Sequence, residues 1–323
     1  MPTYNRAELL PGSIASILDQ DFRDLELLIV DDGSTDDTFD VIENIRAQDS
    51  RLRYMRLPEN RGVGYARNAG QQHVSGKYIA HADSDDLWLP GKLRAQVDAL
   101  ERHPEIEILF GDFWNIDHLR GTSARAFEQK KVGMQHLLVR HLEGDLYVVD
   151  SGLEVGILRK VFVQLGTVLL RAEVLKKVGG FDGTPSGPED LEFCWRAAVL
   201  KAQFAYLDRP LVERHKFESS VTANFSTLVE QIDVVLRNFR QESRRLRRHD
   251  LLPHIHAAEH RLWRRLIKRH CERGERRRVL WAYGKSLRHG FSLRTFAFCL
   301  LGMAGSPALS TVMELRARLA RPS

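Results

Sequence analysis

Short apolar runs alternate with stretches of helical periodicity along the first two thirds of this 323-residue chain. Each run is bounded by turn-forming or polar residues, which is typical of a buried strand. The first three predicted strands cover residues 25–30, 52–57 and 78–82. Capping residues and apolar positions spaced three and four apart predict helices within 36–47, 60–73 and 91–102. Strands that alternate with helices favour a parallel sheet covered by helices, so we expect an α/β fold.

The pattern continues less evenly from residue 106 to residue 207. Residues 106–110 predict another strand, whereas 111–166 show scattered charges without a sustained period. We expect this stretch to be irregular, with one helix near 134–141. The elements expected after it are a strand at 166–170, a short helix ending at Val178, a helix from Glu189 to about Lys201, and a strand at 204–207. Beyond Leu228 the sequence predicts arginine-rich helices.

Charge divides the chain near the same point. Residues 237–323 contain 21 Lys and Arg against 6 Asp and Glu, a net charge of +15, whereas residues 1–236 contain 27 against 37, a net charge of −10. We therefore expect an α/β domain over 1–227 and a basic helical region over 228–323. The 43% of hydrophobic residues excludes a disordered chain. Three widely spaced cysteines and a start without a signal peptide favour the cytoplasm.

Two clusters of carboxylates follow predicted strands. Asp31-Asp32 ends the first strand, and Asp83-Ser84-Asp85-Asp86 ends the third. Because ligands bind at the carboxyl ends of parallel strands, we expect both clusters to face one cleft. Carboxylates close together repel one another unless a cation is present, and hard oxygen ligands favour Mg²⁺ or Mn²⁺. For the first cluster alone, a turn and a helix cap explain the residues at least as well.

These motifs and several others resemble family 2 glycosyltransferases in order and spacing over roughly residues 1–225. The matching segments are Pro2 to Arg6, Asp31 to Thr38, Asn60-Arg61-Gly62, Ala66-Arg67-Asn68, Asp83 to Asp86, Gly179 to Asp182, and Glu189-Asp190. The resemblance implies the GT-A fold, a Rossmann-like mixed sheet flanked by helices. It also implies transfer of a sugar, with inversion, from a nucleoside diphosphate sugar, expected to be UDP-linked, to an acceptor hydroxyl, in the synthesis of cell-surface polysaccharides or glycans.

The resemblance also assigns roles to residues. Thr3, Tyr4 and Asp31 would hold the base of the nucleotide, and Asp83 would meet the ribose. Asp85 would bind the metal on the diphosphate, and Asp190 would be the catalytic base.

Three further side chains have weaker assignments. Arg61 and Arg67 suit the nucleotide's phosphates or base edges, but a solvated helix surface explains either one equally well. His215, placed on a loop after the last predicted strand, is a candidate to close over the diphosphate or metal.

One feature departs from the resemblance. Relatives have four to six apolar residues before the Pro-x-Tyr-Asn motif, and this chain begins at Met1-Pro2 without them. We therefore expect either that the true start lies upstream or that the sheet has lost its first strand.

Other functions were weighed against the transferase. A GT-A-like nucleotidyltransferase needs a glycine-rich phosphate loop with a lysine near the start, which the sequence lacks. A Mg²⁺-binding signalling module, such as a phospho-receiver, also uses acidic strand ends but is far shorter and has no use for Glu189-Asp190. The basic region would attract nucleic acid, but arginines alternate with apolar residues there, which favours amphipathic helices on an anionic membrane.

The uncharged stretch Thr295–Met313 raises the question of a membrane span. Gly305-Ser306-Pro307 interrupts it, which favours two short helices over one spanning helix. We therefore expect a protein peripheral to the inner face of the plasma membrane, with a nucleoside diphosphate sugar and a sugar or lipid-linked acceptor as its partners.

Overall fold

The computed structural model describes residues 1–129, 131–182, 188–217 and 225–304. The chain divides into two compact units, Met1–Ser220 and Val221–Ser323, and each is described below by itself.

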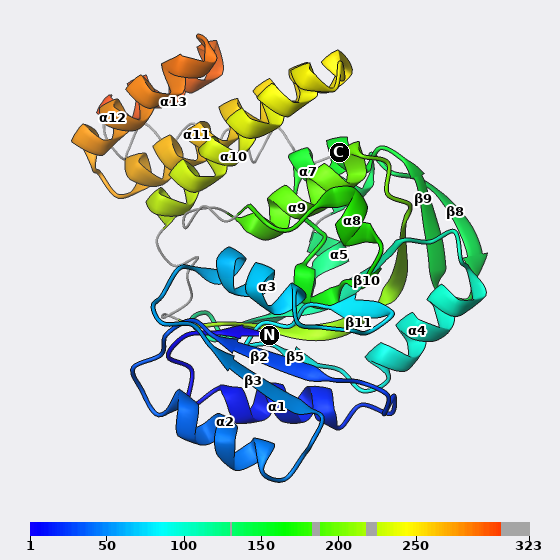
Figure 1. Cartoon of the computed structure of the whole chain (residues 1–323). Coiled ribbons are helices and arrows are strands. Elements are labelled where there is room, and N and C mark those ends of the chain that lie inside the picture. Colours follow the sequence, from blue (N-terminus) through cyan, green and yellow to red (C-terminus); the bar gives the residue numbers. More distant parts are fainter. Residues whose placement is uncertain (130, 183–187, 218–224, 305–323) are drawn as a thin grey trace. The chain divides into compact units, whose positions relative to one another are not determined.

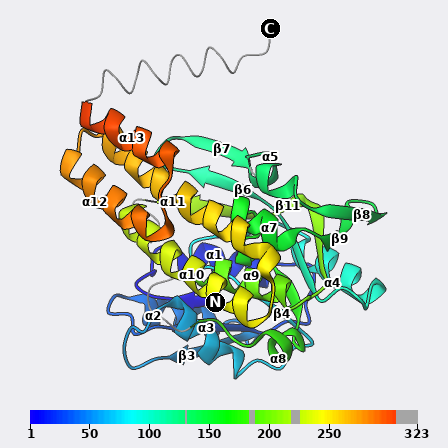
Figure 2. The same cartoon turned by 90° about the horizontal axis from the view of Figure 1, so that it is seen from above.

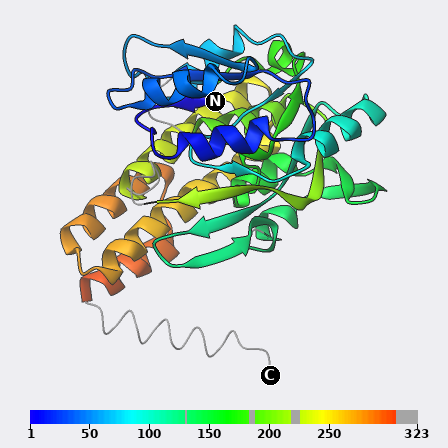
Figure 3. The same ribbon diagram turned by 90° about the horizontal axis from the view of Figure 1, so that it is seen from below.

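The first unit begins with a three-stranded parallel sheet in the order β1-β2-β3 (Figure 1). Its strands are β1 (Pro2–Thr3), β2 (Leu27–Asp31) and β3 (Leu52–Arg56). Alternate residues of β2 face opposite sides, so Leu27 and Ile29 join the core with α1 (Leu10–Leu18) and α2 (Thr38–Arg46), whereas Leu28 and Val30 pack with α3 (Val63–Gln71). The helices α1 and α2 lie on one side of this sheet and α3 on the other (Figures 1 and 3).

A second, mixed sheet of eight strands completes the unit. Its main path is β4-β10-β6-β11-β9-β8, with β5 paired to β11 and β7 to β6. The strands are β4 (Tyr78–Ala80), β5 (Leu87–Trp88), β6 (Ile108–Asp117), β7 (Thr122–Arg125), β8 (Leu138–Glu143), β9 (Leu146–Ser151), β10 (Leu169–Arg171) and β11 (Phe204–Lys216). The parallel pair β6 and β11 forms its centre, and β10 and β9 flank that pair in antiparallel pairing.

Helices surround the second sheet. They are α4 (Lys92–Arg102), α5 (Ala126–Gln129), α6 (Lys131–Met134), α7 (Leu153–Arg159), α8 (Val174–Val178) and α9 (Glu189–Val199), with a 3₁₀ turn, η1, at Leu165–Thr167. As the spacing predicted, α4 buries Leu93, Val97 and Leu100 in the core. The strands and helices predicted before residue 106 are therefore confirmed, with ends shifted by a few residues.

The predicted irregular stretch 111–166 and its helix near 134–141 are wrong. The strand β6 continues to Asp117, and β8 and β9 form a hairpin whose turn contains Gly144 at φ +51°. Most residues of β8 are exposed, so no alternation of apolar and polar positions marks the strand in the sequence.

Two other predictions of the sheet need correction. The last strand extends to Lys216 rather than ending at 207, because β11 passes Pro210 through a register irregularity against β6. The first strand is present and short rather than lost: Pro2 and Thr3 pair in parallel with Val30 and Asp31.

The second unit is helical in the part that the structure describes. It contains α10 (Phe225–Arg245), η3 (His249–Leu251), α11 (Leu252–Glu272), α12 (Arg276–Ser286), η4 (Leu287–His289) and α13 (Leu293–Ala304) (Figure 2). Its core includes Trp263, Leu266 and Ile267 of α11 and Val279 of α12.

A buried charged group also stabilises this unit. Nε2 of His289 lies 2.8 Å from Asp233, and its Nδ1 lies 3.2 Å from Glu259. These hydrogen bonds, to Asp233 first and then to Glu259, raise the pKa of His289 to about 9. The imidazole is therefore charged at neutral pH.

Among the described residues, no helix has both the length and the apolar character needed to cross a bilayer. The interruption predicted at Gly305-Ser306-Pro307 lies outside the described residues.

Candidate active site

The acidic segment Asp83 to Asp86 directly follows β4 and lies against the end of β11. Gln164 donates from Nε2 to Asp83 (3.3 Å) and to Asp86 (2.9 Å), and the backbone N–H of His215 donates to Asp86 (3.2 Å). Burial, followed by repulsion from neighbouring carboxylates, raises the pKa of Asp85 and raises that of Asp86 well above its ordinary value. Negative charge is therefore crowded at this point of the unit.

The loop after β1 brings a cation to this cluster. Asn5 has a left-handed backbone (φ +51°), accepts the N–H of Thr35 (2.8 Å) and donates its own N–H to Ser34 Oγ (2.9 Å). The next residue, Arg6, lies 3.8 Å from Asp85. The polar pairs between the two loops therefore position a guanidinium beside the predicted metal ligand.

Arg67 joins the acidic segment to the distant Glu189-Asp190 pair. Its guanidinium donates to Asp83 (2.6 Å) and to Glu189, which are 16 and 122 residues away in the chain. The Arg67 side chain is only 4% exposed, whereas Glu189 is 14% and Asp83 29% exposed, so the guanidinium itself is shielded from water. This arginine is the contact through which the two predicted carboxylate motifs meet.

The helix that carries Arg67 is fixed to the loop before α9. Asn68 accepts the N–H of Phe181 and donates to its carbonyl, both at 2.8 Å. Gly64 also lies so close to this loop that a Cβ atom there would come within 2.9 Å of the carbonyl oxygen of Asp182. The motif Ala66-Arg67-Asn68 therefore holds α3 against the segment that leads into α9.

Glu189 and Asp190 are the first two residues of α9. Burial raises the pKa of Glu189, although Arg67 opposes the rise. One oxygen of Asp190 accepts the N–H of Leu191 (2.7 Å). The carboxylate of Asp190 is therefore bonded to the backbone of the first turn of α9.

The residues predicted to hold a base lie at the start of the chain and after β2. Thr3 is buried, and among the described residues its Oγ1 has no hydrogen-bond partner, whereas Tyr4 is exposed. Asp31 is fully buried, where its oxygens accept the N–H of Ser34 and the hydroxyl of Tyr54, both at 2.8 Å. Arg61, predicted for the phosphates or base edges of the nucleotide, stacks its guanidinium 3.8 Å above the ring of Tyr65.

Asp32 has a structural contact that the sequence did not reveal. Its two oxygens accept the backbone N–H groups of Arg61 (2.9 Å) and Gly62 (2.7 Å) at the start of α3. The helix α3 therefore connects the two acidic clusters. Asp32 bonds to the backbone at the start of α3, and Arg67, in the second turn of α3, donates to Asp83.

His215 lies within β11, so its predicted place on a loop is wrong. Its Nδ1 lies 2.8 Å from Nε2 of His118, the two rings stack with centroids 5.1 Å apart, and Phe217 stacks on His118 at 4.7 Å. Its backbone N–H holds Asp86, so the residue does border the acidic segment.

Sequence reasoning missed two contributors to this site. Gln164 lies in a stretch predicted to be irregular, and no motif marks it. Arg6 was quoted in the first motif without a role. Arg67, considered only as a phosphate ligand or a solvated side chain, is instead a buried bridge.

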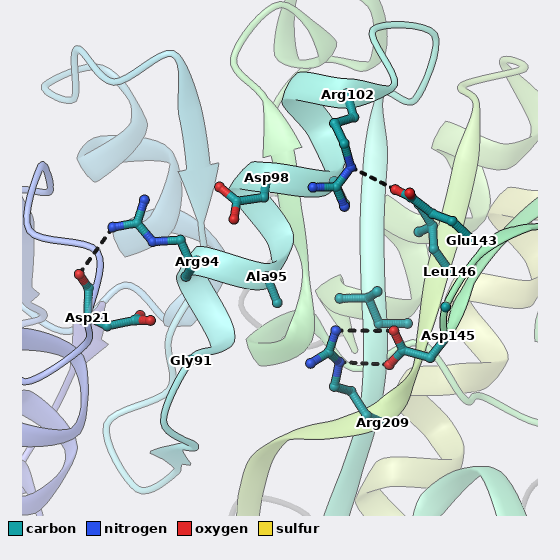
Figure 4. A pocket seen from close by; sticks show the side chains of 13 residues that line it. Asp21, Gly91, Arg94, Ala95, Asp98, Arg102, Glu143, Asp145, Leu146 and Arg209 are labelled. Carbon is teal, nitrogen blue, oxygen red and sulfur yellow. Dashed lines mark hydrogen bonds and ion pairs between the residues drawn. The ribbon is translucent and has the colours of Figure 1, made fainter.

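Two surface grooves lie elsewhere in the unit. One of about 420 Å³ is lined by α4, the β8–β9 turn and β11 (Figure 4). Two of its three arginines form ion pairs, Arg102 with Glu143 and Arg209 with Asp145, each at 2.7 Å, and the third, Arg94, donates to the backbone carbonyl of Asp21 (3.3 Å). The other groove, of about 440 Å³, lies beside Arg125 and Phe127. Neither groove is lined by a residue that the sequence predicted for the site.

The family model described as glycosyl transferase family 2 matches residues 1–165. Over 97 residues the chain is 38% identical to the putative teichuronic acid biosynthesis glycosyltransferase TuaG of Bacillus subtilis. This match covers 30% of this chain and 38% of TuaG. Over 114 residues it is 36% identical to WfgD of Escherichia coli, which is named as a UDP-Glc:α-D-GlcNAc-diphosphoundecaprenol β-1,3-glucosyltransferase. That match covers 35% of this chain and 44% of WfgD. The chain therefore spans less than half the length of these curated relatives.

Solved structures resemble the chain over most of its length. Staphylococcus aureus TarS 1–349, in complex with UDP-GlcNAc, aligns with a TM-score of 0.55 at 18% identity, covering 89% of this chain and 87% of that one. The mannosyltransferase PcManGT of Pyrobaculum calidifontis, in complex with GDP-Man and Mn²⁺, aligns with a TM-score of 0.58 at 18% identity. This alignment covers 97% of this chain and 81% of PcManGT. These matches confirm the predicted GT-A fold.

Proposed function

The chain belongs to glycosyl transferase family 2, and from this membership and the geometry of its acidic site we propose that residues 1–227 transfer a sugar from a UDP-sugar to an acceptor hydroxyl with inversion at the anomeric carbon. The observation that carries the proposal is the contact of Arg67 with both Asp83 and Glu189. It places the carboxylates assigned to the donor beside the pair assigned to proton transfer, and inverting transfer needs both at one reacting carbon.

The donor is proposed to lie between the first loop and the acidic segment. Thr3, whose buried hydroxyl has no partner among the described residues, Tyr4, Asp31 and Arg61 are the proposed contacts to the base. Asp83 is the proposed partner of the ribose hydroxyls. Donor complexes of the structural neighbours TarS and PcManGT support a nucleotide sugar as the ligand class.

A divalent cation, Mg²⁺ or Mn²⁺, fits the acidic segment. The chemistry of the donor set supports this, because Asp85 is a hard oxygen ligand in a cluster where burial and repulsion between neighbouring carboxylates raise the pKa of Asp85 and Asp86. No group of three or more His, Cys, Asp or Glu side chains in the described part of the chain is arranged to hold a metal ion by itself. Mg²⁺ sites commonly use one or two carboxylates together with substrate phosphates and water, so Asp85 suffices as the protein ligand. The cation would neutralise charge that develops on the departing nucleoside diphosphate.

Asp190 is the proposed general base. It lies in the first turn of α9, and its carboxylate can take the hydroxyl proton of the acceptor as that oxygen attacks the sugar. Glu189 is occupied by Arg67, which leaves Asp190 as the member of the pair available to the acceptor. Arg67 therefore fixes the orientation of α9 relative to Asp83.

The acceptor is proposed to be a sugar linked to a lipid diphosphate, in the synthesis of a cell-surface polymer. Relatives support this class. WfgD is named for a diphosphoundecaprenol-linked acceptor, and a Campylobacter jejuni protein is named for a PP-undecaprenol-linked acceptor. The Campylobacter jejuni protein is 41% identical over 95 residues, which cover 29% of this chain and 30% of that protein. A lipid-linked acceptor requires a protein that works at a membrane. We propose that the basic region 228–323 holds the chain peripherally at the inner face of the plasma membrane.

The proposed function is tested by release of UDP from a panel of UDP-sugars in the presence of Mn²⁺ and a synthetic polyprenyl diphosphate sugar. Acceptor-dependent release that disappears in Asp190→Asn and persists in Glu192→Gln, a matched change in the same helical turn, would support it. Release that is unaffected by Asp190→Asn would contradict the assignment of the base.

A further inference from the structure

The outer face of α12, η4 and α13 exposes large apolar side chains. Leu293 is 72% exposed and Phe291 is 65% exposed. The remaining exposed large apolar residues of this face are Leu280, Trp281, Leu287 and Leu300. We refer to these six residues as the α12–α13 face. Because α12 and α13 are neighbouring helices, these side chains gather on one part of the unit instead of being scattered singly, which marks an interaction surface.

The helix α13 is apolar on two sides. Cys299 is buried in the core of the second unit, with Phe298 packed against that core. Leu293, Ala297 and Leu300 are spaced four and three residues apart, so they form a second stripe on the exposed side. A surface helix of a globular protein normally has a polar outer side, and α13 lacks one at these positions.

Positive charge surrounds this apolar face. From Arg276 to Ala304 the sequence contains six Arg and Lys residues and no Asp or Glu. Arg276, Arg277 and Arg288 are exposed, and none has an ion pair within the part of the chain that the structure describes. Lys285 lies 5.7 Å above the ring of Trp281. Basic side chains are therefore interleaved with the exposed apolar ones on α12 and η4.

This combination selects one kind of partner. A second copy of the chain that packed the same face against this one would bring Arg276, Arg277 and Arg288 close to their own copies, which is unfavourable. An anionic bilayer complements both features, since its headgroups attract the arginines and its acyl chains accept the apolar residues. Because no helix among the described residues is suited to crossing a bilayer, binding would be interfacial.

We propose that the α12–α13 face is the membrane-binding surface of the chain, with Phe291, Leu293 and Leu300 inserted below the headgroups of an anionic leaflet and Arg276, Arg277 and Arg288 at their level. The proposal deepens the proposed function by naming the surface that would hold the enzyme at the membrane of its lipid-linked acceptor. The biological role of this surface rests on the proposed function, whereas its binding to an anionic membrane does not. Its evidence comes from residues outside the acidic site.

The test is flotation of the full chain with vesicles of phosphatidylcholine that contain 30% phosphatidylglycerol, and with pure phosphatidylcholine. Binding is expected only with the anionic vesicles. The triple variant R276Q/R277Q/R288Q should lower partitioning by about a hundredfold, at roughly fivefold per cation, whereas the same three changes to Lys should preserve it. The variant F291S/L293S should also lose flotation, while Leu138→Ser, an equally exposed leucine of β8, should retain it.

Depth is measured separately through Trp281, which is 40% exposed. Lipids brominated on the acyl chain should quench tryptophan fluorescence in the native chain and much less in Trp281→Phe. Equal flotation with both vesicle types, or full flotation of F291S/L293S, would overturn the proposal. Dimers of the native chain that F291S/L293S converts to monomers, without vesicle binding, would also overturn it and would assign the face to a second copy.

Two controls separate these outcomes from the proposed function. Each variant should keep its far-ultraviolet circular dichroism spectrum and its stabilisation by UDP and Mn²⁺, since neither depends on the α12–α13 face. If the native chain does not bind UDP, the result would contradict the proposed transferase function without affecting the interpretation of the flotation experiment.

Discussion

Replacing Arg67 with Met should destabilise the first unit and separate its two carboxylate motifs. The change removes a guanidinium that is 4% exposed and leaves Asp83 and Glu189 without their shared cation. Loss of one partner from a buried ion pair typically costs about 3–5 kcal/mol. This is a large part of the roughly 5–15 kcal/mol that stabilises an ordinary domain.

The assay is urea unfolding followed by circular dichroism, with Arg61→Met as the control because Arg61 is exposed and forms no ion pair with a carboxylate in the part of the chain that the structure describes. We expect the urea midpoint to fall sharply for Arg67→Met. For Arg61→Met, the free energy of unfolding should change by about 1 kcal/mol or less. Arg67→Lys should be intermediate, since an ammonium keeps the charge but cannot span two carboxylates as a guanidinium does.

A double variant makes the result specific to the bridge. Removing the orphaned charge with Glu189→Gln in the Arg67→Met background should restore part of the lost stability, by 1 kcal/mol or more. Additive effects of the two changes, or an Arg67→Met midpoint within error of the native chain, would refute the reasoning that this arginine couples the motifs.

Three further predictions follow from particular contacts. Asp85→Asn should abolish the extra thermal stabilisation that Mn²⁺ gives to the UDP complex while leaving the unfolding temperature of the free chain close to native, because the cation loses its protein ligand; stabilisation equal to native would exclude Asp85 as the ligand. His289 has a folded pKa raised to about 9 from an ordinary 6.5, so its stabilisation of the second unit, up to about 3 kcal/mol, should be complete below pH 6.5 and be lost as pH rises through 9. Hydrogen exchange of α10 and α11 amides across this range should show that loss in the native chain and not in His289→Gln. Tyr54→Phe removes the hydroxyl that donates to buried Asp31 and should cost about 1–3 kcal/mol in urea unfolding, and an unchanged midpoint would show that the hydrogen bond contributes nothing.

The parts of the fold that the sequence predicted are those with local signals. The strand before Asp31, the strand before Asp83 and the helix over 91–102 each combine a periodic apolar pattern with flanking turn or capping residues. The acidic motifs could be located for the same reason, since a carboxylate run directly after a strand is visible without knowledge of the tertiary structure.

The errors lie where long-range pairing overrides local pattern. The hairpin of β8 and β9 is attached to the sheet through β11, and its outer strand is mostly exposed. Residues 134–141 therefore contain four apolar residues but no alternation of apolar and polar positions. Likewise β11 continues past Pro210 because β6 provides parallel partners for the five residues from Val212 to Lys216, whereas the sequence predicted a strand that ends at Leu207.

The candidate site shows the same division. Asp85 and Asp190 are recognisable in their motifs, but Arg67 contacts Glu189 across 122 positions of the chain, and no spacing rule predicts this contact. Gln164, which donates to two carboxylates of the acidic segment, has no sequence signal because a single glutamine in an aperiodic stretch is unremarkable. Polar contacts between distant segments are therefore the part of a site for which the structure is required.

The central claim is that Asp190 acts as the base in an inverting transfer, and the most direct measurement is nuclear magnetic resonance of the glycosidic product formed from an α-linked UDP-sugar. The account predicts a β-linked product from the native chain and a rate lower by about 10² or more in Asp190→Asn, with donor affinity nearly unchanged. An α-linked product, or a native rate in Asp190→Asn, would contradict it.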